Sequence, residues 1–210
     1  MPLTDAARKA LYQARVEQSR YDEAVDEVVR ELENHVRYCK YMPLGEIERR
    51  ISSRVKEFDR IEEKVDIPRK RSVGSLADLE ARVTDIAGVR VVLDRLDQVK
   101  ETGTFIQDNG RWRILRVEKC RRGYTGYRSL HVDVELDTTH HKSVRCEIQC
   151  RTLLEHAFAL WTTPLYQYYR TDPKSVPPVL FGRMREISDA LHHVDKQVNG
   201  LAKEFRRLAT

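Results

Sequence analysis

The segment SVRCEIQCRT, residues 143–152, alternates between apolar and polar side chains along its length. A period of two is typical of a β-strand with one face on a hydrophobic core. The polar face of this strand has two interpretations: a solvated surface, which is the commoner case, or a surface that binds a phosphorylated ligand. The apolar face would carry Val144, Cys146, Ile148 and Cys150, and the polar face Arg145, Glu147, Gln149 and Arg151.

Three further segments predict strands that accompany this one. Residues 85–94 are rich in β-branched side chains, residues 111–118 alternate, and residues 127–136 place four aliphatic side chains on one face. The sequence HHKS at 140–143 is a turn between the last of these and the opening strand. Residues 127–152 are therefore predicted to form an antiparallel hairpin.

Helices are predicted at both ends of the chain. Residues 4–40 contain no proline or glycine and repeat valine and leucine at helical spacing, which predicts one long helix or two in series. Residues 76–83 predict a short helix, and residues 51–56 fit either a helix or a strand. A helix from 153 to about 169 has Pro164 as a kink or boundary, and another begins near Val179.

The fold class that follows is α+β, with a mixed, mostly antiparallel sheet flanked by N- and C-terminal helices. We expect an N-terminal helical region over residues 1–42, a core over 43–175 and a C-terminal helix over 176–210. With 210 residues the chain is long enough for these parts to form one compact domain.

Composition favours anionic partners. Lys and Arg number 38 against 33 Asp and Glu, which gives a net charge of +5. The four cysteines form no CxxC pair, so free thiols are expected rather than a disulfide framework or a cysteine metal site. No apolar run approaches the length of a membrane span, and the first residues lack the apolar core of a secretory signal. We expect a soluble, cytoplasmic protein.

The polar face of the predicted hairpin carries side chains suited to phosphoryl transfer. Carboxylates that converge from different strands can hold Mg²⁺, which prefers a few carboxylate oxygens together with substrate phosphates. Guanidinium groups nearby would bind those phosphates. The side chains concerned are His131, Asp133, Glu135, Glu147, Gln149 and Arg151, joined by Asp85 and Arg90 from the strand at 85–94.

Four strings, in order and spacing, resemble the synthetase domain of the RelA/SpoT alarmone synthetases. They are ISSRVKEFDRIEEKV at 51–65, TDIAGVRVV at 84–92, GYRSLHVDVEL at 126–136 and CEIQCRTLLEHAFALW at 146–161. The tail from 176 to 198 is similar to the C-terminal helix of short members. The resemblance covers roughly residues 45–195 and implies a nucleotidyltransferase-like fold.

The resemblance also implies an activity: transfer of the β,γ-pyrophosphate of ATP to the ribose 3′-hydroxyl of GDP or GTP, which makes (p)ppGpp and releases AMP. Asp85 and Glu147 match the family's catalytic carboxylates and Mg²⁺ ligands. Tyr127 matches the tyrosine that stacks on the acceptor base, and His131 and Gln149 would lie beside the acceptor. The cations assigned to ATP are Arg54, Lys56, Arg90, Lys119, Arg121, Arg122 and Arg151.

Departures from the family pattern leave the acceptor open. The segment VEKCRRGYTGYRSLH, residues 117–131, is shorter than its family counterpart and lacks a proline, although it keeps positive charge. The basic balance and PRKR at 68–71 also fit a toxin-type relative that pyrophosphorylates the 3′ end of tRNA. An inactive nucleotide-binding relative and a plain RNA-binding domain are further alternatives.

Partners other than ATP and the acceptor nucleotide follow from those alternatives: tRNA, an antitoxin protein and a second copy of the chain. No membrane partner is expected. Two histidine pairs are not assigned to metal. His140 and His141 are predicted in a turn, and His192 and His193 on a helix surface.

Overall fold

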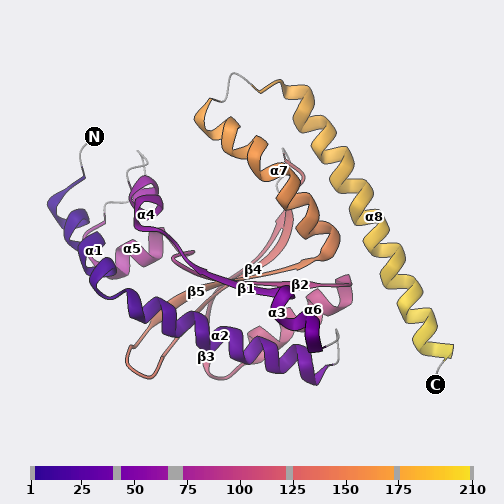
Figure 1. Ribbon diagram of the computed structural model, residues 1–210, viewed down its shortest axis with the longest axis horizontal. Coiled ribbons are helices and arrows are strands. Elements are labelled where there is room, and N and C mark those ends of the chain that lie inside the picture. Colours follow the sequence, from indigo (N-terminus) through magenta and orange to yellow (C-terminus); the bar gives the residue numbers. More distant parts are fainter. Residues whose placement is uncertain (1–2, 40–43, 66–72, 122–124, 173–175, 209–210) are drawn as a thin grey trace.

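A computed structural model describes residues 3–39, 44–65, 73–121, 125–172 and 176–208. Within these ranges the chain forms eight helices and one five-stranded sheet (Figure 1). The helices are α1 (Asp5–Val16), α2 (Gln18–Tyr38), α3 (Leu44–Arg50), α4 (Phe58–Val65), α5 (Leu76–Arg82), α6 (Leu96–Asp108), α7 (Leu153–Thr171) and α8 (Pro178–Leu208). The strands are β1 (Ile51–Val55), β2 (Ala87–Leu93), β3 (Trp112–Arg121), β4 (Arg128–Leu136) and β5 (Val144–Thr152).

The sheet has the order β1-β2-β5-β4-β3. β2 runs parallel to β5, and the other three pairings are antiparallel. The predicted hairpin is confirmed, since β4 and β5 pair from Leu130–Cys150 to Leu136–Val144. The α+β class with a mixed, mostly antiparallel sheet is therefore confirmed, and residues 51–55 are a strand rather than a helix.

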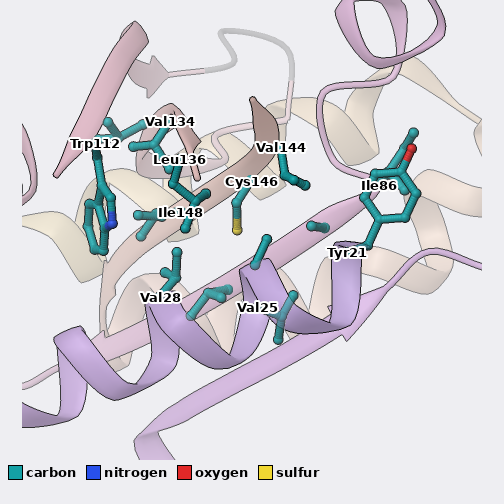
Figure 2. Packing of buried hydrophobic residues seen from close by; sticks show 14 of the residues in the cluster. Tyr21, Val25, Val28, Ile86, Trp112, Val134, Leu136, Val144, Cys146 and Ile148 are labelled. Carbon is teal, nitrogen blue, oxygen red and sulfur yellow. The ribbon is translucent and has the colours of Figure 1, made fainter. Parts of the chain in front are cut away.

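The apolar face of the sheet packs against α2 and α6. Figure 2 shows side chains of β4 and β5 facing Val25 and Val28 of α2. Tyr21 of the same helix is fully buried and donates its hydroxyl hydrogen to Glu80 at 3.0 Å. The N-terminal helices thus share one hydrophobic core with the sheet.

Helix α6 was not predicted from the sequence. It contains Gly103, a residue that weakens a helical pattern. The structure gives that glycine a packing reason, because an added Cβ would lie 2.4 Å from Cδ2 of Leu130 on β4. The absence of a side chain lets α6 approach the sheet closely.

The opposite face of the sheet is covered by α7, with α8 beside α7 on the outside (Figure 1). This argues against the solvated interpretation of the polar face of β5, because Glu147 and Arg151 on that face are only 6% and 5% exposed. Pro164 was predicted to kink or to end a helix. It does not end one, since α7 continues to Thr171. Hydroxyls of Thr162 and Thr163 donate to carbonyls of the turn before the proline, at 2.8 and 2.6 Å.

Two further findings concern the described residues. The four cysteines are free thiols, three of them buried. No helix there has the length and apolar character required to cross a membrane.

Candidate functional site

A polar cleft lies between the sheet and α7. It has a volume of about 520 Å³ and adjoins a pocket of about 180 Å³ that shares five of its residues. Cavities of this size accommodate nucleotide-sized ligands. The shared residues are Arg54, Asp85, Arg90, Glu147 and Gln149.

Asp85 lies in the turn that leads into β2, where three cations surround its carboxylate. The Nζ atoms of Lys56 and Lys64 each lie 2.7 Å from one of its oxygens, and a guanidinium nitrogen of Arg54 lies at 3.6 Å. Burial alone would raise the pKa of Asp85, but the hydrogen bonds from the two lysines outweigh burial and hold the pKa below its usual range. Asp85 is therefore ionised at neutral pH.

Glu147 projects from the middle of β5 into the same cleft. Its Oε1 lies 3.2 Å from Nδ1 of His131, and its Oε2 accepts a hydrogen bond from the amide of Gln149 at 2.5 Å. Burial acts to raise the pKa of Glu147, yet the contacts with His131 and Gln149 keep it below the ordinary value. The buried carboxylate is held ionised and fixed in orientation.

Tyr127 precedes β4 and is joined to this group. Its hydroxyl oxygen lies 3.0 Å from Nε2 of His131 and accepts a hydrogen bond from Arg151. The guanidinium of Arg151 also lies over the tyrosine ring, 4.9 Å from its centroid. Arg151 therefore holds the tyrosine through both its hydroxyl and its ring.

Arg90 of β2 lines both parts of the cleft. Within the described residues its Nε is buried without a hydrogen-bond partner. Burial lowers the pKa of Arg90, and the positive charges of Arg151 and Arg54 lower it further. Arg54, Arg90 and Arg151 place three guanidinium groups in this cleft, which suits it to a polyanion.

The structure brings most of the predicted site residues together but not all of them. Lys56 is buried against Asp85 and does not line the cleft. Lys119 is exposed at a β3 position paired with Leu130, on the sheet face away from the cleft. Arg121 lies 3.6 Å from Asp189 of α8. Arg122 and the PRKR segment lie outside the described residues.

Several residues of the cleft were not predicted. Lys64 reaches Asp85 from α4, and Arg116 reaches the cleft from β3, where its Nε donates to Asp133 at 2.9 Å. The alternation of residues 111–118 was a usable signal for Arg116, whereas no spacing links Lys64 to Asp85. α7 and α8 supply the remaining wall through Ala159, Leu160, Thr162, Thr163, Tyr166 and Met184.

Comparison with known proteins gives consistent findings. The chain is 28% identical over 157 residues to the GTP pyrophosphokinase YwaC of Bacillus subtilis, which is 72% of each chain. It resembles the structure of a GTP pyrophosphokinase family protein from Streptococcus pneumoniae, with 26% identity, a TM-score of 0.73 and coverage of 93% and 96% of the two chains. It also shares the fold of small alarmone synthetase 1 from Bacillus subtilis bound to its product pppGpp, with a TM-score of 0.71, 24% identity and coverage of 93% and 99%.

The family match extends over a longer stretch of the chain than any of the four motifs named in the sequence analysis. Residues 53–171 match the profile of the region found in RelA/SpoT proteins. This range contains every residue that lines the cleft and its adjoining pocket except Ser52 of β1 and Met184 of α8. The match covers more than half of the chain. The protein belongs to the RelA/SpoT family.

Proposed function

We propose that this protein is an ATP-dependent pyrophosphokinase that transfers the β,γ-pyrophosphate of ATP to the 3′-hydroxyl of GDP or GTP. The observation that carries the proposal is the convergence of Asp85 and Glu147 with Arg54 and Arg90 in one cleft of a RelA/SpoT chain. A relative of the same fold is described as bound to its product pppGpp. The product here would be (p)ppGpp, with AMP released.

The donor would bind at the end of the cleft near Asp85. Arg54 and Arg90 line that end and would bind its phosphates, and Arg116 lines the larger part of the cleft. Lys64 is 35% exposed in its side chain and lies near enough to contact a phosphate as well as Asp85. These cations are held in place before the substrate binds, so they can stabilise the negative charge of the phosphates with little movement of protein groups during the reaction.

The acceptor would bind beside Tyr127 and His131, with its base stacked on the tyrosine ring. Its 3′-oxygen would attack the β-phosphorus of ATP, and the bridging oxygen would leave with AMP. Glu147 lies between the two ends and is ionised, so it can accept the hydroxyl proton as the new bond forms. His131 holds Glu147 in place through the 3.2 Å contact.

Mg²⁺ is the metal that the family implies, and the donor set fits it. Asp85 and Glu147 are ionised oxygen donors that line the same pocket, as a hard cation with phosphate ligands requires. When bound there, Mg²⁺ would neutralise charge on the transferred group. Lys56 and Lys64 each contact one oxygen of Asp85 and keep it ionised, and Mg²⁺ would take the place of one of these contacts.

The other predicted partners remain proposals. Self-association has support in α8, where apolar side chains recur at intervals of three, four or seven residues and are 43–62% exposed: Ile187, Val194, Val198, Leu201 and Phe205. Light scattering on the full chain would measure the oligomeric state. A cytoplasmic location, a tRNA acceptor and an antitoxin protein also remain predictions.

The first experiment is to incubate the purified protein with Mg²⁺ and ATP labelled at the γ-phosphate. GDP, GTP, ATP and bulk tRNA are offered in parallel as acceptors. We expect label on GDP or GTP, with an equal amount of AMP. Glu147→Gln should lower the rate by about 10²–10³-fold, because it removes a proton acceptor and a negative charge while nearly preserving shape.

The acceptor arms separate the alternatives. Label on tRNA alone would show that the acceptor is RNA and not a guanosine nucleotide. Absence of both label and AMP would exclude the enzyme and leave a nucleotide-binding domain. Equal activity of Glu147→Gln would remove that residue from the reaction.

A further inference from the structure

A group of potential metal ligands lies where α8 crosses the start of α7, outside the cleft. Among the described residues, Glu155 of α7 and His192 and Asp195 of α8 place one ligand atom each within 4.8 Å of one another. His192 and Asp195 are three positions apart on α8, so they share one face of the helix. We propose that these three side chains form a binding site for a divalent transition metal of the Zn²⁺ class.

The first argument is that neither carboxylate has a direct ion-pair partner among the described residues. Asp195 is 2% exposed, and no described Lys, Arg or His nitrogen lies within 4.0 Å of its carboxylate or that of Glu155. Glu155, beside it, is partly buried. Two carboxylates held side by side away from solvent are costly unless a cation accompanies them. A divalent ion would provide that charge.

The second argument is a buried nitrogen that lacks a partner. Nδ1 of His192 is buried, and within the described residues it has no hydrogen bond. A neutral imidazole is the form that binds a metal. His192 is partly exposed on α8, and its neighbour His193 is exposed.

The third argument is the way Thr152 holds both carboxylates. Its backbone N–H donates to Oε2 of Glu155 at 3.0 Å, and its hydroxyl donates to Oδ2 of Asp195 at 2.6 Å. One residue thus orients the two acids and leaves the second oxygen of each for another ligand. Metal-ligating carboxylates in proteins are usually oriented by such hydrogen bonds.

One imidazole with two carboxylates favours Zn²⁺, Co²⁺ or Mn²⁺ over Mg²⁺, which binds mainly oxygen and keeps several waters. Tetrahedral bonds of about 2.0–2.2 Å require donor atoms roughly 3.3–3.6 Å apart, so the three groups need to close by about 1.5 Å at most. A solvent molecule would complete the set. The bound ion would tie α8 to the start of α7, where Arg128 also meets Asp189 of α8.

The test uses Co²⁺, whose visible absorption reports a tetrahedral site with mixed ligands. The metal-free full chain, without an affinity tag, is titrated with Co²⁺ and then with Zn²⁺ as competitor. Glu147→Gln is used as the background, so that the cleft does not contribute. We expect one equivalent of Co²⁺ with a strong visible band, displaced by Zn²⁺.

Two variants and one control make the assignment specific. His192→Ala should weaken Co²⁺ binding at least tenfold and abolish the band, and His193→Ala, one position along the same helix, should bind as the parent does. Glu155→Gln decides the matter if His192→Ala does not fold, because glutamine preserves the capping box with Thr152 while removing a ligand charge. Retention of the band in Glu155→Gln or in folded His192→Ala, or no Co²⁺ binding by the parent, would overturn the proposal.

Discussion

Nδ1 of His131 lies 3.2 Å from Oε1 of Glu147, across the β4–β5 ladder. The other ring nitrogen of His131 lies 3.0 Å from the hydroxyl of Tyr127, which accepts a hydrogen bond from Arg151. The imidazole therefore joins the tyrosine at the acceptor end of the cleft to the carboxylate at its centre. Substitutions that remove only the hydroxyl of Tyr127, or the whole side chain, test the separate contributions of the hydroxyl and the ring to catalysis.

Tyr127→Phe keeps the ring and removes the hydroxyl, whereas Tyr127→Ala removes both. If the ring stacks on the acceptor base, the alanine variant should raise the KM for GTP by roughly 5–100-fold, the range that base–aromatic stacking supports. The phenylalanine variant should keep that KM within a few fold and lose part of kcat, because His131 and Arg151 lose a partner. Steady-state kinetics with GTP and ATP varied in turn would measure this. A similar rise of the KM for ATP in the alanine variant would count against an acceptor role.

Asp85 and Lys56 form a mostly buried ion pair, with side-chain exposures of 15% and 9%. Asp85→Asn should lower the free energy of unfolding by about 3–5 kcal/mol, because the charge of Lys56 is left buried without its partner. The double variant Asp85→Asn with Lys56→Met should recover part of that loss. Urea unfolding of the four proteins of this cycle gives the coupling energy. Additive losses would show that the pair is not coupled.

The same pair predicts a pH dependence of stability. The pKa of Asp85 is lower in the folded chain than the ordinary value of about 3.9, so the unfolded chain binds more protons at acid pH. The stability that Asp85 contributes is fully present above that ordinary value and is lost as the pH falls through the lowered folded pKa. The difference between wild type and Asp85→Asn should be constant near neutral pH and shrink below about pH 4. Urea midpoints measured from pH 7 down to pH 3 would check this.

Much of the sheet could be predicted because its signal is local. The alternation of Val144 to Thr152 survives in the folded chain, and the hairpin follows from one turn between two alternating runs. The burial of Glu147 could not be predicted in the same way, since it depends on α7 lying over the polar face. Single-strand periodicity does not report what packs on the second face.

Cleft residues that lie in a sequence motif could be predicted. Cleft residues that reach the site only through the tertiary fold could not. Asp85 and Glu147 follow from short strings, and their shared pocket agrees with the pairing of β2 and β5. Lys64 reaches Asp85 across 21 positions of sequence, and no periodicity links them. Lys119 shows the converse: its charge suggested a phosphate contact, but its strand position points away from the cleft.

Arg116 is a cleft residue that the motifs did not indicate. Its Nε donates to Asp133 at 2.9 Å, and Asp133 is 4% exposed, so the guanidinium is anchored at one side. If Arg116 binds a nucleotide phosphate, Arg116→Met should lower kcat/KM by about 10–100-fold, the loss of a charge-assisted hydrogen bond of 1.5–3 kcal/mol. Arg113→Met on the same strand is the control, because Arg113 is exposed and pairs with Glu135 outside the cleft. Equal losses in both variants would indicate a general effect on β3.

Gly126, next to Tyr127, connects the acceptor end of the cleft to α8. Its φ of +75° lies in the left-handed region, and an added Cβ would lie 2.6 Å from Cβ of Ser188 and 3.2 Å from the backbone of Arg185. The hydroxyl of Ser188 donates to the carbonyl of Gly126, so the two segments cannot simply separate. Gly126→Ala should therefore cost about 1–3 kcal/mol of stability, from backbone strain and from displacement of α8.

A matched glycine lies on α8 itself. Gly182 has open space where its Cβ would be, and it lies inside a helix, so Gly182→Ala should stabilise the chain by about 0.5–1 kcal/mol. Thermal unfolding of both variants gives the two signs in one experiment. Because Gly126 precedes Tyr127, its alanine variant should also raise the KM for the acceptor more than the KM for ATP. A folded Gly126→Ala protein with wild-type stability would mean that α8 does not pack tightly against this turn. The inference that α8 is rigidly connected to the acceptor end of the cleft would then be wrong.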